Sequence, residues 1–224
     1  MPRKPTIRTN LYPYHVVARC HNKEWFKLPI ETMWKIYTEI IRDVCREEGA
    51  KVISFVLMNN HFHLMVWTPR ENIDRVMYWI MKRSTQEVQK RTGIINSIYG
   101  GRYKSSLLTK VQYQYNCYKY ILRNPVVAGL CDLVQDYPYS TYHYSFFNQS
   151  LPFELLDKSL PNLFGSTRAL ESWLNKSYTD KEARSIKTGL SRNKFEFAKC
   201  NNSRKQVIPN LSLGTMHPEK YPGT

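Results

Sequence analysis

Acidic residues and paired cysteines are both scarce in this chain. Its 224 residues include 18 Asp and Glu against 33 Lys and Arg, which gives a formal net charge of +15. The five cysteines are odd in number and widely spaced, with no C-x-x-C pair. Neither a disulfide scaffold nor a cysteine-rich zinc site is therefore expected, and a reduced, cytoplasmic environment is predicted.

Long apolar runs are also missing. No stretch approaches the roughly 18 apolar residues that a membrane-spanning helix needs. The first residues, MPRKPTIRTN, carry charge but lack the apolar region of a secretory signal. An apolar fraction of 42% is still enough to build a core. The excess of positive charge favours nucleic acid as the partner, ahead of an anionic membrane surface.

Apolar alternation and helical spacing predict the order of elements up to residue 124. Asn59-Asn60 separates two apolar runs and tolerates the left-handed backbone of a tight hairpin turn. Pro125 is expected to end the last helix, because the residue before a proline disfavours helical geometry. The expected elements are a strand over 14–20, a helix over 29–49, hairpin strands over 51–58 and 61–67, a helix over 73–93, a weaker strand over 102–110 and a helix over 112–124.

This order is the β-α-β-β-α-β pattern of ferredoxin-like folds, followed by one extra helix. We therefore expect an α+β fold in which two helices cover one face of an antiparallel sheet. Residues 1–142 are expected to form one domain, closed by an aromatic loop or cover segment over 136–147. Residues 143–224 are expected to be a basic, partly helical extension, with helices over 167–176 and 180–190 and a tail that is disordered or ordered on contact.

His61-Phe62-His63 is the strongest local signal for chemistry. On a strand, residues i and i+2 point to the same face, so both imidazoles project together while Phe62 faces the core. Two neutral imidazoles side by side would form half of a metal site. The alternative is a pair of surface histidines on a hairpin.

Tyr120 and Asn124 are four residues apart, and hence on one face of the last helix. Asn124 could supply a carbonyl oxygen to a metal, with the Tyr120 phenol beside it. A tyrosine has a pKa of about 10 and needs a nearby cation or base to act as a nucleophile. A metal held by His61, His63 and Asn124 would meet that need. The alternative is that Tyr120 is one of sixteen tyrosines engaged in packing.

Four blocks follow one another in the sequence: N-H-F-H-L at 60–64, G-R-Y-K-S-S at 101–106, Y-x-x-x-N-P-V-V-A-G at 120–129 and D-Y-P-Y-S-T-Y at 136–142. Together they resemble the single-tyrosine HUH transposases, and in particular the REP-associated tyrosine transposases. The resemblance runs from about Tyr14 to Tyr142 and implies a bacterial-type, cytoplasmic protein associated with the nucleoid.

The resemblance implies that His61 and His63 bind a divalent metal, Mg²⁺ or Mn²⁺, and that Tyr120 is the nucleophile. It further implies cleavage and rejoining of single-stranded DNA beside imperfect palindromes folded as hairpins, through a 5′-phosphotyrosyl intermediate. Related transposases carry a glutamine as third ligand four residues after the tyrosine, where this chain has the shorter Asn124. Family members act as monomers or as dimers, and the sequence does not decide between them.

Basic residues surround the predicted centre. From Val88 to Cys131 there are seven Lys and Arg and no acidic residue, which suits a track for phosphate groups. Interleaved tyrosines would stack on unpaired bases unless they lie in the core; these are Tyr99, Tyr103, Tyr113, Tyr115 and Tyr118. The cations expected to bind DNA are Arg8, Arg19, Arg102, Lys104, Lys110, Lys119 and Arg123.

Two other functions are compatible with the sequence. One is a hairpin DNA- or RNA-binding protein that has the fold without the chemistry. The other is a metal-dependent phosphoesterase that uses the histidines and no tyrosine. A covalent DNA adduct that disappears in Tyr120→Phe would separate the transferase from both.

Overall fold

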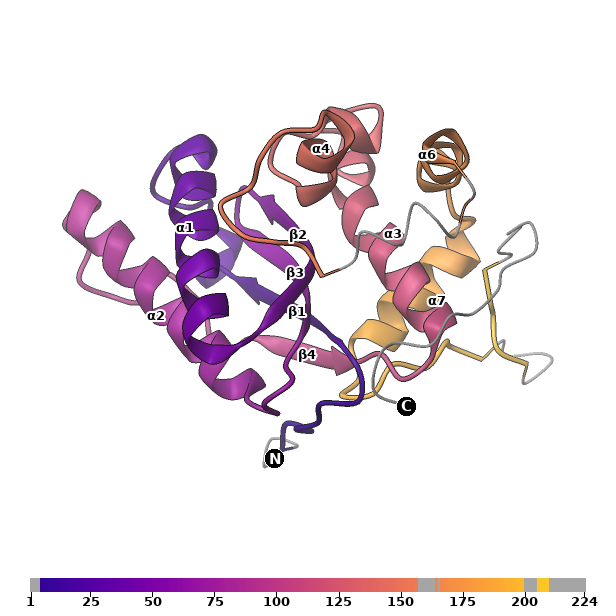
Figure 1. Ribbon diagram of the computed structural model, residues 1–224, viewed down its shortest axis with the longest axis horizontal. Helices are drawn as coiled ribbons and strands as arrows, with labels where there is room; N and C mark the ends of the chain where they lie inside the picture. The colour runs from indigo at the N-terminus through magenta and orange to yellow at the C-terminus, as the bar shows by residue number, and fades with distance from the viewer. Residues whose placement is uncertain (1–4, 157–163, 165, 200–204, 210–224) are drawn as a thin grey trace.

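A four-stranded sheet in the order β2-β3-β1-β4 lies at the centre of the computed structural model (Figure 1), which describes residues 5–156, 164, 166–199 and 205–209. Its strands are β1 (Tyr14–Arg19), β2 (Lys51–Met58), β3 (His61–Trp67) and β4 (Lys104–Leu107). Strand β3 is antiparallel to both β1 and β2, and β4 is antiparallel to β1. The expected α+β class and element order are confirmed.

Two helices cover one face of the sheet, as expected: α1 (Ile30–Glu48) and α2 (Ile73–Thr92). Strand side chains that point toward them, such as Val16, Phe55 and Leu64, form one apolar core with both helices. Each helix ends at a glycine with positive φ, Gly49 at 72° and Gly93 at 73°, a conformation that strains other residues. Within the described residues, no helix is long and apolar enough to cross a bilayer.

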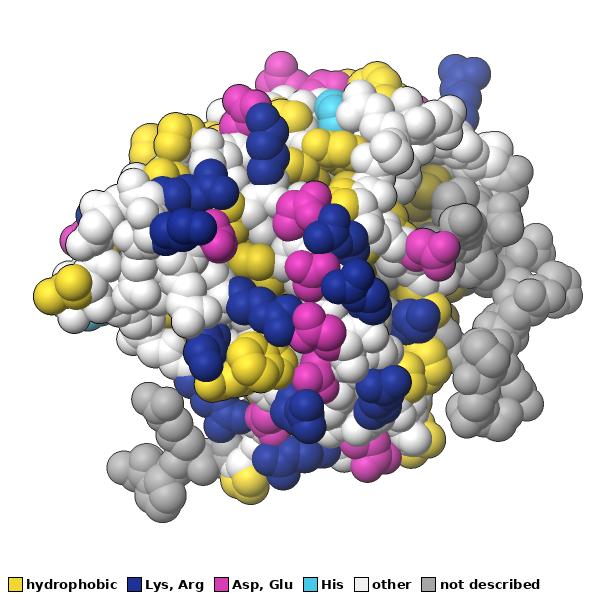
Figure 2. Space-filling model, turned by 60° about the vertical axis from the view of Figure 1, so that its left-hand side comes forward, with side chains coloured by type: hydrophobic (Ala, Val, Ile, Leu, Met, Phe, Trp, Pro, Cys, Tyr) yellow, Lys and Arg dark blue, Asp and Glu magenta, His cyan; other side chains and the backbone are white. Residues whose placement is uncertain are grey.

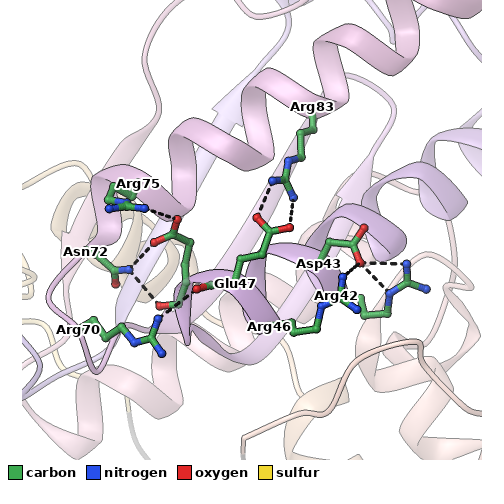
Figure 3. A network of polar contacts seen from close by, with 9 residues as sticks. Arg42, Asp43, Arg46, Glu47, Arg70, Asn72, Arg75 and Arg83 are labelled. Atoms are coloured by element: carbon green, nitrogen blue, oxygen red, sulfur yellow. Dashed lines mark hydrogen bonds and ion pairs between the residues drawn. The ribbon is translucent and has the colours of Figure 1, made fainter.

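Ion pairs join α1 to α2 along their outer side (Figure 3). Arg83 donates to both carboxylate oxygens of Glu47, at 3.0 and 2.5 Å. The buried Glu48 carboxylate accepts from Asn72 and from Arg75, at 3.0 Å each, so its charge is matched. On the surface viewed from this side, basic and acidic side chains lie interleaved (Figure 2). Acidic and basic charges on this side therefore largely balance. The two helices cover this face of the sheet.

Helix α3 (Val111–Val127) covers part of the opposite face, where Cys117 and Ile121 pack with Val56 of β2 in a second core. The expectation that α3 ends before Pro125 is wrong, because Pro125 lies within the helix. A proline has no N–H for the carbonyl four residues earlier, here that of Ile121. The Asn124 amide compensates by donating to the carbonyls of Tyr120, at 2.7 Å, and Ile121, at 3.5 Å.

Three further helices lie around α3 (Figure 1): α4 (Thr141–Phe146), α6 (Thr167–Asn175) and α7 (Asp180–Leu190). The last two agree with the expected helices. The segment 136–147 is partly helical rather than a loop, because the Ser140 hydroxyl accepts from the His143 N–H and caps α4. The proposed domain boundary at residue 142 stays a prediction, and the expected tail lies from residue 210 onward outside the described residues.

Candidate functional site

His61 and His63, here called the histidine pair, lie on the sheet face that α3 covers. Strand alternation sends Phe62 and Leu64 into the core beneath α1 and α2, and sends both imidazoles the other way. Their ring centroids are 5.0 Å apart. The side chains are buried, with 9% of His61 and 5% of His63 exposed, so the alternative of surface histidines does not hold.

Hydrogen bonds determine which nitrogen of His61 carries the proton. The Asn60 amide nitrogen donates to the Lys23 carbonyl at 2.7 Å, which turns its oxygen toward Nδ1 of His61 at 2.6 Å. Because an amide oxygen only accepts, Nδ1 of His61 is the N–H. Its Nε2 therefore keeps a lone pair, as a metal ligand at that atom must.

His15 of β1 is a third member of the site, and the sequence analysis missed it. Its Nε2 lies 2.9 Å from Nδ1 of His63, and the two rings stack with centroids 5.2 Å apart. The register places Val17 opposite His63, so His15 shares that face. Only the pairing of β1 with β3 reveals this contact, because alternation within β1 marks His15 no differently from Val17.

Helix α3 places Tyr120 over these rings. Its ring meets His63 and His15 edge-on, with centroids 6.0 and 6.5 Å away. Burial raises the pKa of the Tyr120 phenol and the Cys117 thiol raises it further, while Arg19 opposes both. The phenol is thus held protonated, and a nearby cation would favour its ionisation. Tyr120 lies beside His63 of the histidine pair, and the roles of Tyr120 and the pair stay predictions.

Burial acts in the opposite direction on the histidines, because it disfavours the charged imidazolium. It lowers the pKa of His15 to about 3 and that of His61 to about 4. The pKa of His63 is also lowered well below its usual value, by burial first and by its histidine neighbours next. All three rings are therefore neutral at pH 7 and can act as lone-pair donors.

Asn124, the predicted third ligand, is on the same helix but is not joined to the histidine pair by any interaction among the described residues. Its amide nitrogen is used within α3, and its ligand role stays a prediction. Nor does any group of three or more His, Cys, Asp or Glu in the described part of the chain form a metal cluster. Neutral imidazole nitrogen is a common metal ligand, and the remaining positions of a divalent cation held by two of them would be filled by oxygen from water or a phosphate.

A cavity of about 940 Å³, here called the cleft, opens beside His15, His63 and Tyr120. The residues that line it include five cations and no Asp or Glu; the cations are Arg19, Lys23, Arg102, Lys104 and Lys187. In contrast to the outer side of α1 and α2, only Arg102 of these five cations forms an ion pair within the described residues, with Asp74. The cleft therefore favours a polyanion.

Two more of the predicted DNA-binding cations, Arg8 and Lys110, lie at the surface. Arg8 and Arg102 both bind the Asp74 carboxylate of α2, at 2.6 and 2.5 Å, and Arg102 also lines the cleft. Lys110 is exposed at the start of α3, with its amine 5.4 Å above the Tyr113 ring. Arg8 and Arg102 share the single negative charge of Asp74. Both are partly neutralised by it, which weakens the attraction of each to a phosphate.

The remaining two, Lys119 and Arg123, are buried, with 4% and 6% exposed. The Lys119 amine lies 4.9 Å above the Trp173 ring and 4.7 Å above the Tyr178 ring, and burial lowers its pKa to about 8. Arg123 donates to the carbonyls at the end of α6. This burial argues against a DNA contact for either side chain.

The interleaved tyrosines do not form a stacking surface. All five are at most 9% exposed and belong to the two apolar cores. The expectation that they stack on unpaired bases is therefore corrected, and they act in packing.

Comparison with known proteins agrees with this geometry. A family model described as IS200-like transposase matches residues 8–124. The solved structure of a REP-associated tyrosine transposase bound to a REP hairpin is 18% identical over 71% of this chain and 96% of its own, with a TM-score of 0.57. At that identity the likeness shows the fold.

A second solved structure, of a Deinococcus radiodurans protein proposed to be a transposase, is 14% identical. It covers 54% of this chain and 94% of its own with a TM-score of 0.37, a likeness too slight to support an argument. No relative among curated proteins matches the chain.

Replacing Arg123 by Met is expected to destabilise the fold, because it leaves the Leu174 and Asn175 carbonyls without their donor. The expected loss is about 2 kcal/mol in the free energy of unfolding. Lys110→Met, at an exposed position on the same helix, serves as the control and should change stability little. Urea unfolding of the three proteins measures this, and equal losses in both variants would contradict the buried role of Arg123.

Stability is expected to fall with pH below about 6.5. Since the pKa of His15 is about 3 in the folded chain and near 6.5 when unfolded, the unfolded chain binds more protons between these values. The contribution is complete above pH 6.5 and is lost as pH falls toward 3. Denaturation midpoints at pH 7.5, 6 and 4.5 should fall less steeply for His15→Gln than for the unchanged protein. If the denaturation midpoints of the two proteins fell equally with pH, His15 would not take up a proton on unfolding.

Proposed function

The chain belongs to the IS200-like transposase family, and from this premise we propose that it is a metal-dependent single-stranded DNA endonuclease and strand transferase. It would cut and rejoin DNA next to hairpins formed by imperfect palindromes. The observation that carries the proposal is the meeting of Tyr120 with His63 and His15 beside a cleft whose described lining includes five Lys and Arg side chains and no Asp or Glu. A transposase of similar fold bound to a REP hairpin supports the choice of hairpin DNA.

Tyr120 is the nucleophile in this proposal. Its oxygen attacks the scissile phosphorus and forms a 5′-phosphotyrosyl bond, while the bond from phosphorus to the 3′ oxygen breaks. That oxygen takes up a proton and leaves as a free 3′-hydroxyl. A second 3′-hydroxyl attacks the phosphotyrosyl bond in the reverse sense and releases Tyr120. One phosphodiester replaces another, so no nucleotide hydrolysis is needed.

The histidine pair would hold Mg²⁺ or Mn²⁺. When bound, the cation supplies positive charge that stabilises a phenolate and polarises a phosphoryl oxygen. His61 already has the required tautomer, fixed by Asn60. For His63 to bind a metal through Nε2, its Nδ1 must carry the proton and donate to Nε2 of His15. His15 is then the hydrogen-bond acceptor that orients His63.

The unchanged protein is expected to form a covalent adduct with a 3′-labelled single strand that carries a hairpin, in the presence of Mg²⁺ or Mn²⁺. The adduct should survive denaturation and vanish in Tyr120→Phe, because phenylalanine has no nucleophilic oxygen. Tyr78→Phe is the control, since Tyr78 is an exposed tyrosine on α2, away from the cleft.

Two other results of this experiment would each point to a different function. Binding of several hairpins with no adduct points to a nucleic-acid-binding protein without chemistry. Cleavage that persists in Tyr120→Phe and stops with EDTA points to a phosphoesterase that uses the histidines alone.

The role of His15 can be tested without catalysis. His15→Leu removes the acceptor and should weaken Mn²⁺ binding about 10- to 100-fold. His15→Gln keeps a side-chain oxygen that can accept from His63 and should retain most of the affinity. Free Mn²⁺, measured by electron paramagnetic resonance, gives the affinity directly. Equal affinities in all three proteins would show that His15 does not orient a ligand.

A further inference from the structure

The end of α7 forms one side of the cleft, although α7 lies outside residues 8–124 that the family model matches. Lys187 and Leu190 of α7 line the same cavity as the residues of the candidate site, and so do Ser191 and Asn193, which follow the helix. The C-terminal region therefore contributes directly to the surface that leads to Tyr120.

Helix α7 is held firmly in this position. Ile186 is fully buried in the second core. After the helix, the chain pairs with the outer edge of β4, where Leu107 N–H donates to the Asn193 carbonyl and Phe195 N–H donates to the Leu107 carbonyl, both at 2.9 Å. At Gly189 a Cβ would lie 2.7 Å from the Glu196 carbonyl, so only glycine allows this approach. These contacts fix Lys187 relative to the sheet.

The cations of the cleft differ in whether a carboxylate already neutralises them. Arg102 binds Asp74. Arg19 of β1, Lys104 of β4 and Lys187 of α7 are exposed, and none forms an ion pair with a described residue. Lys23, which is also exposed, likewise forms no ion pair with a described residue. Four of the five cations of the cleft are therefore unpaired among the described residues, which favours a ligand with several negative charges.

We infer that α7 is a DNA-binding element, in which Lys187 contacts the phosphate backbone of the single strand opposite Lys104 and Arg19. This inference rests on the proposed function in one respect, the identity of the polyanion. Phosphates spaced along a strand match cations spaced across the cleft, and Ser191 and Asn193 add hydrogen-bonding groups beside Lys187. The C-terminal extension is then part of the substrate site.

Helix α7 also supplies the matched control. Lys181 is an exposed lysine in the first turn of the same helix, and it does not line the cleft. Lys187→Ala and Lys181→Ala therefore remove the same charge from the same helix, at different distances from the cavity. Lys187→Arg keeps the charge and should restore binding.

The test measures binding of a hairpin-bearing single strand between 50 and 200 mM salt, in the Tyr120→Phe background so that no cleavage interferes. Lys187→Ala is expected to weaken binding severalfold and to make the slope of log K against log salt shallower by about 0.7, as for the loss of one phosphate contact to a single strand. Lys181→Ala should change neither quantity. Thermal unfolding of each variant checks that the fold is kept.

The outcomes separate the two proposals. Equal effects of Lys187→Ala and Lys181→Ala would overturn a specific role for α7, whether or not the protein forms a covalent adduct. A selective effect of Lys187→Ala with no adduct in the Tyr120-containing protein would support the DNA-binding role of α7 and refute the chemistry. Absence of DNA binding in every variant would overturn both.

Discussion

The packing of α3 against the open face of the sheet is the interaction on which the site depends. The histidine pair comes from β3 and His15 comes from β1. Tyr120 comes from α3 and follows His63 by 57 residues in the sequence. Apolar contacts of Cys117 and Ile121 hold α3 over the sheet. Lys119 and Arg123 anchor the other side of the helix to the C-terminal region. These two buried cations thereby help to place Tyr120.

Burial favours the uncharged form of both kinds of ring in this site, so it lowers the pKa of the histidines and raises that of the tyrosine. It keeps His15, His61 and His63 uncharged, which suits them as ligands or hydrogen-bond acceptors. It also opposes ionisation of Tyr120. A divalent cation held by the histidine pair, as proposed, would favour the phenolate and leave the imidazoles neutral.

The net charge of +15 does not by itself locate a DNA-binding surface. Some cations are buried and stabilise the fold, as Arg123 does. Others are matched by acidic partners, as Arg83 is by Glu47 on the outer side of α1 and α2. What distinguishes the cleft is that Lys104 and Lys187 face it and form no ion pair with any residue that the structure describes. The role of a basic residue depends on where it lies and on whether an acidic side chain neutralises it, and composition shows neither.

The sequence by itself determined the element order, the Asn59-Asn60 hairpin, the glycine ends of α1 and α2, and the projection of the histidine pair to one face. These features follow from local backbone preferences and from the period of apolar residues. Tertiary structure decided the rest: the contact of His15 with His63, the burial of Lys119, and the approach of α7 to the cleft. Those depend on strand register and on helix packing between segments far apart in the chain, which local periodicity does not encode.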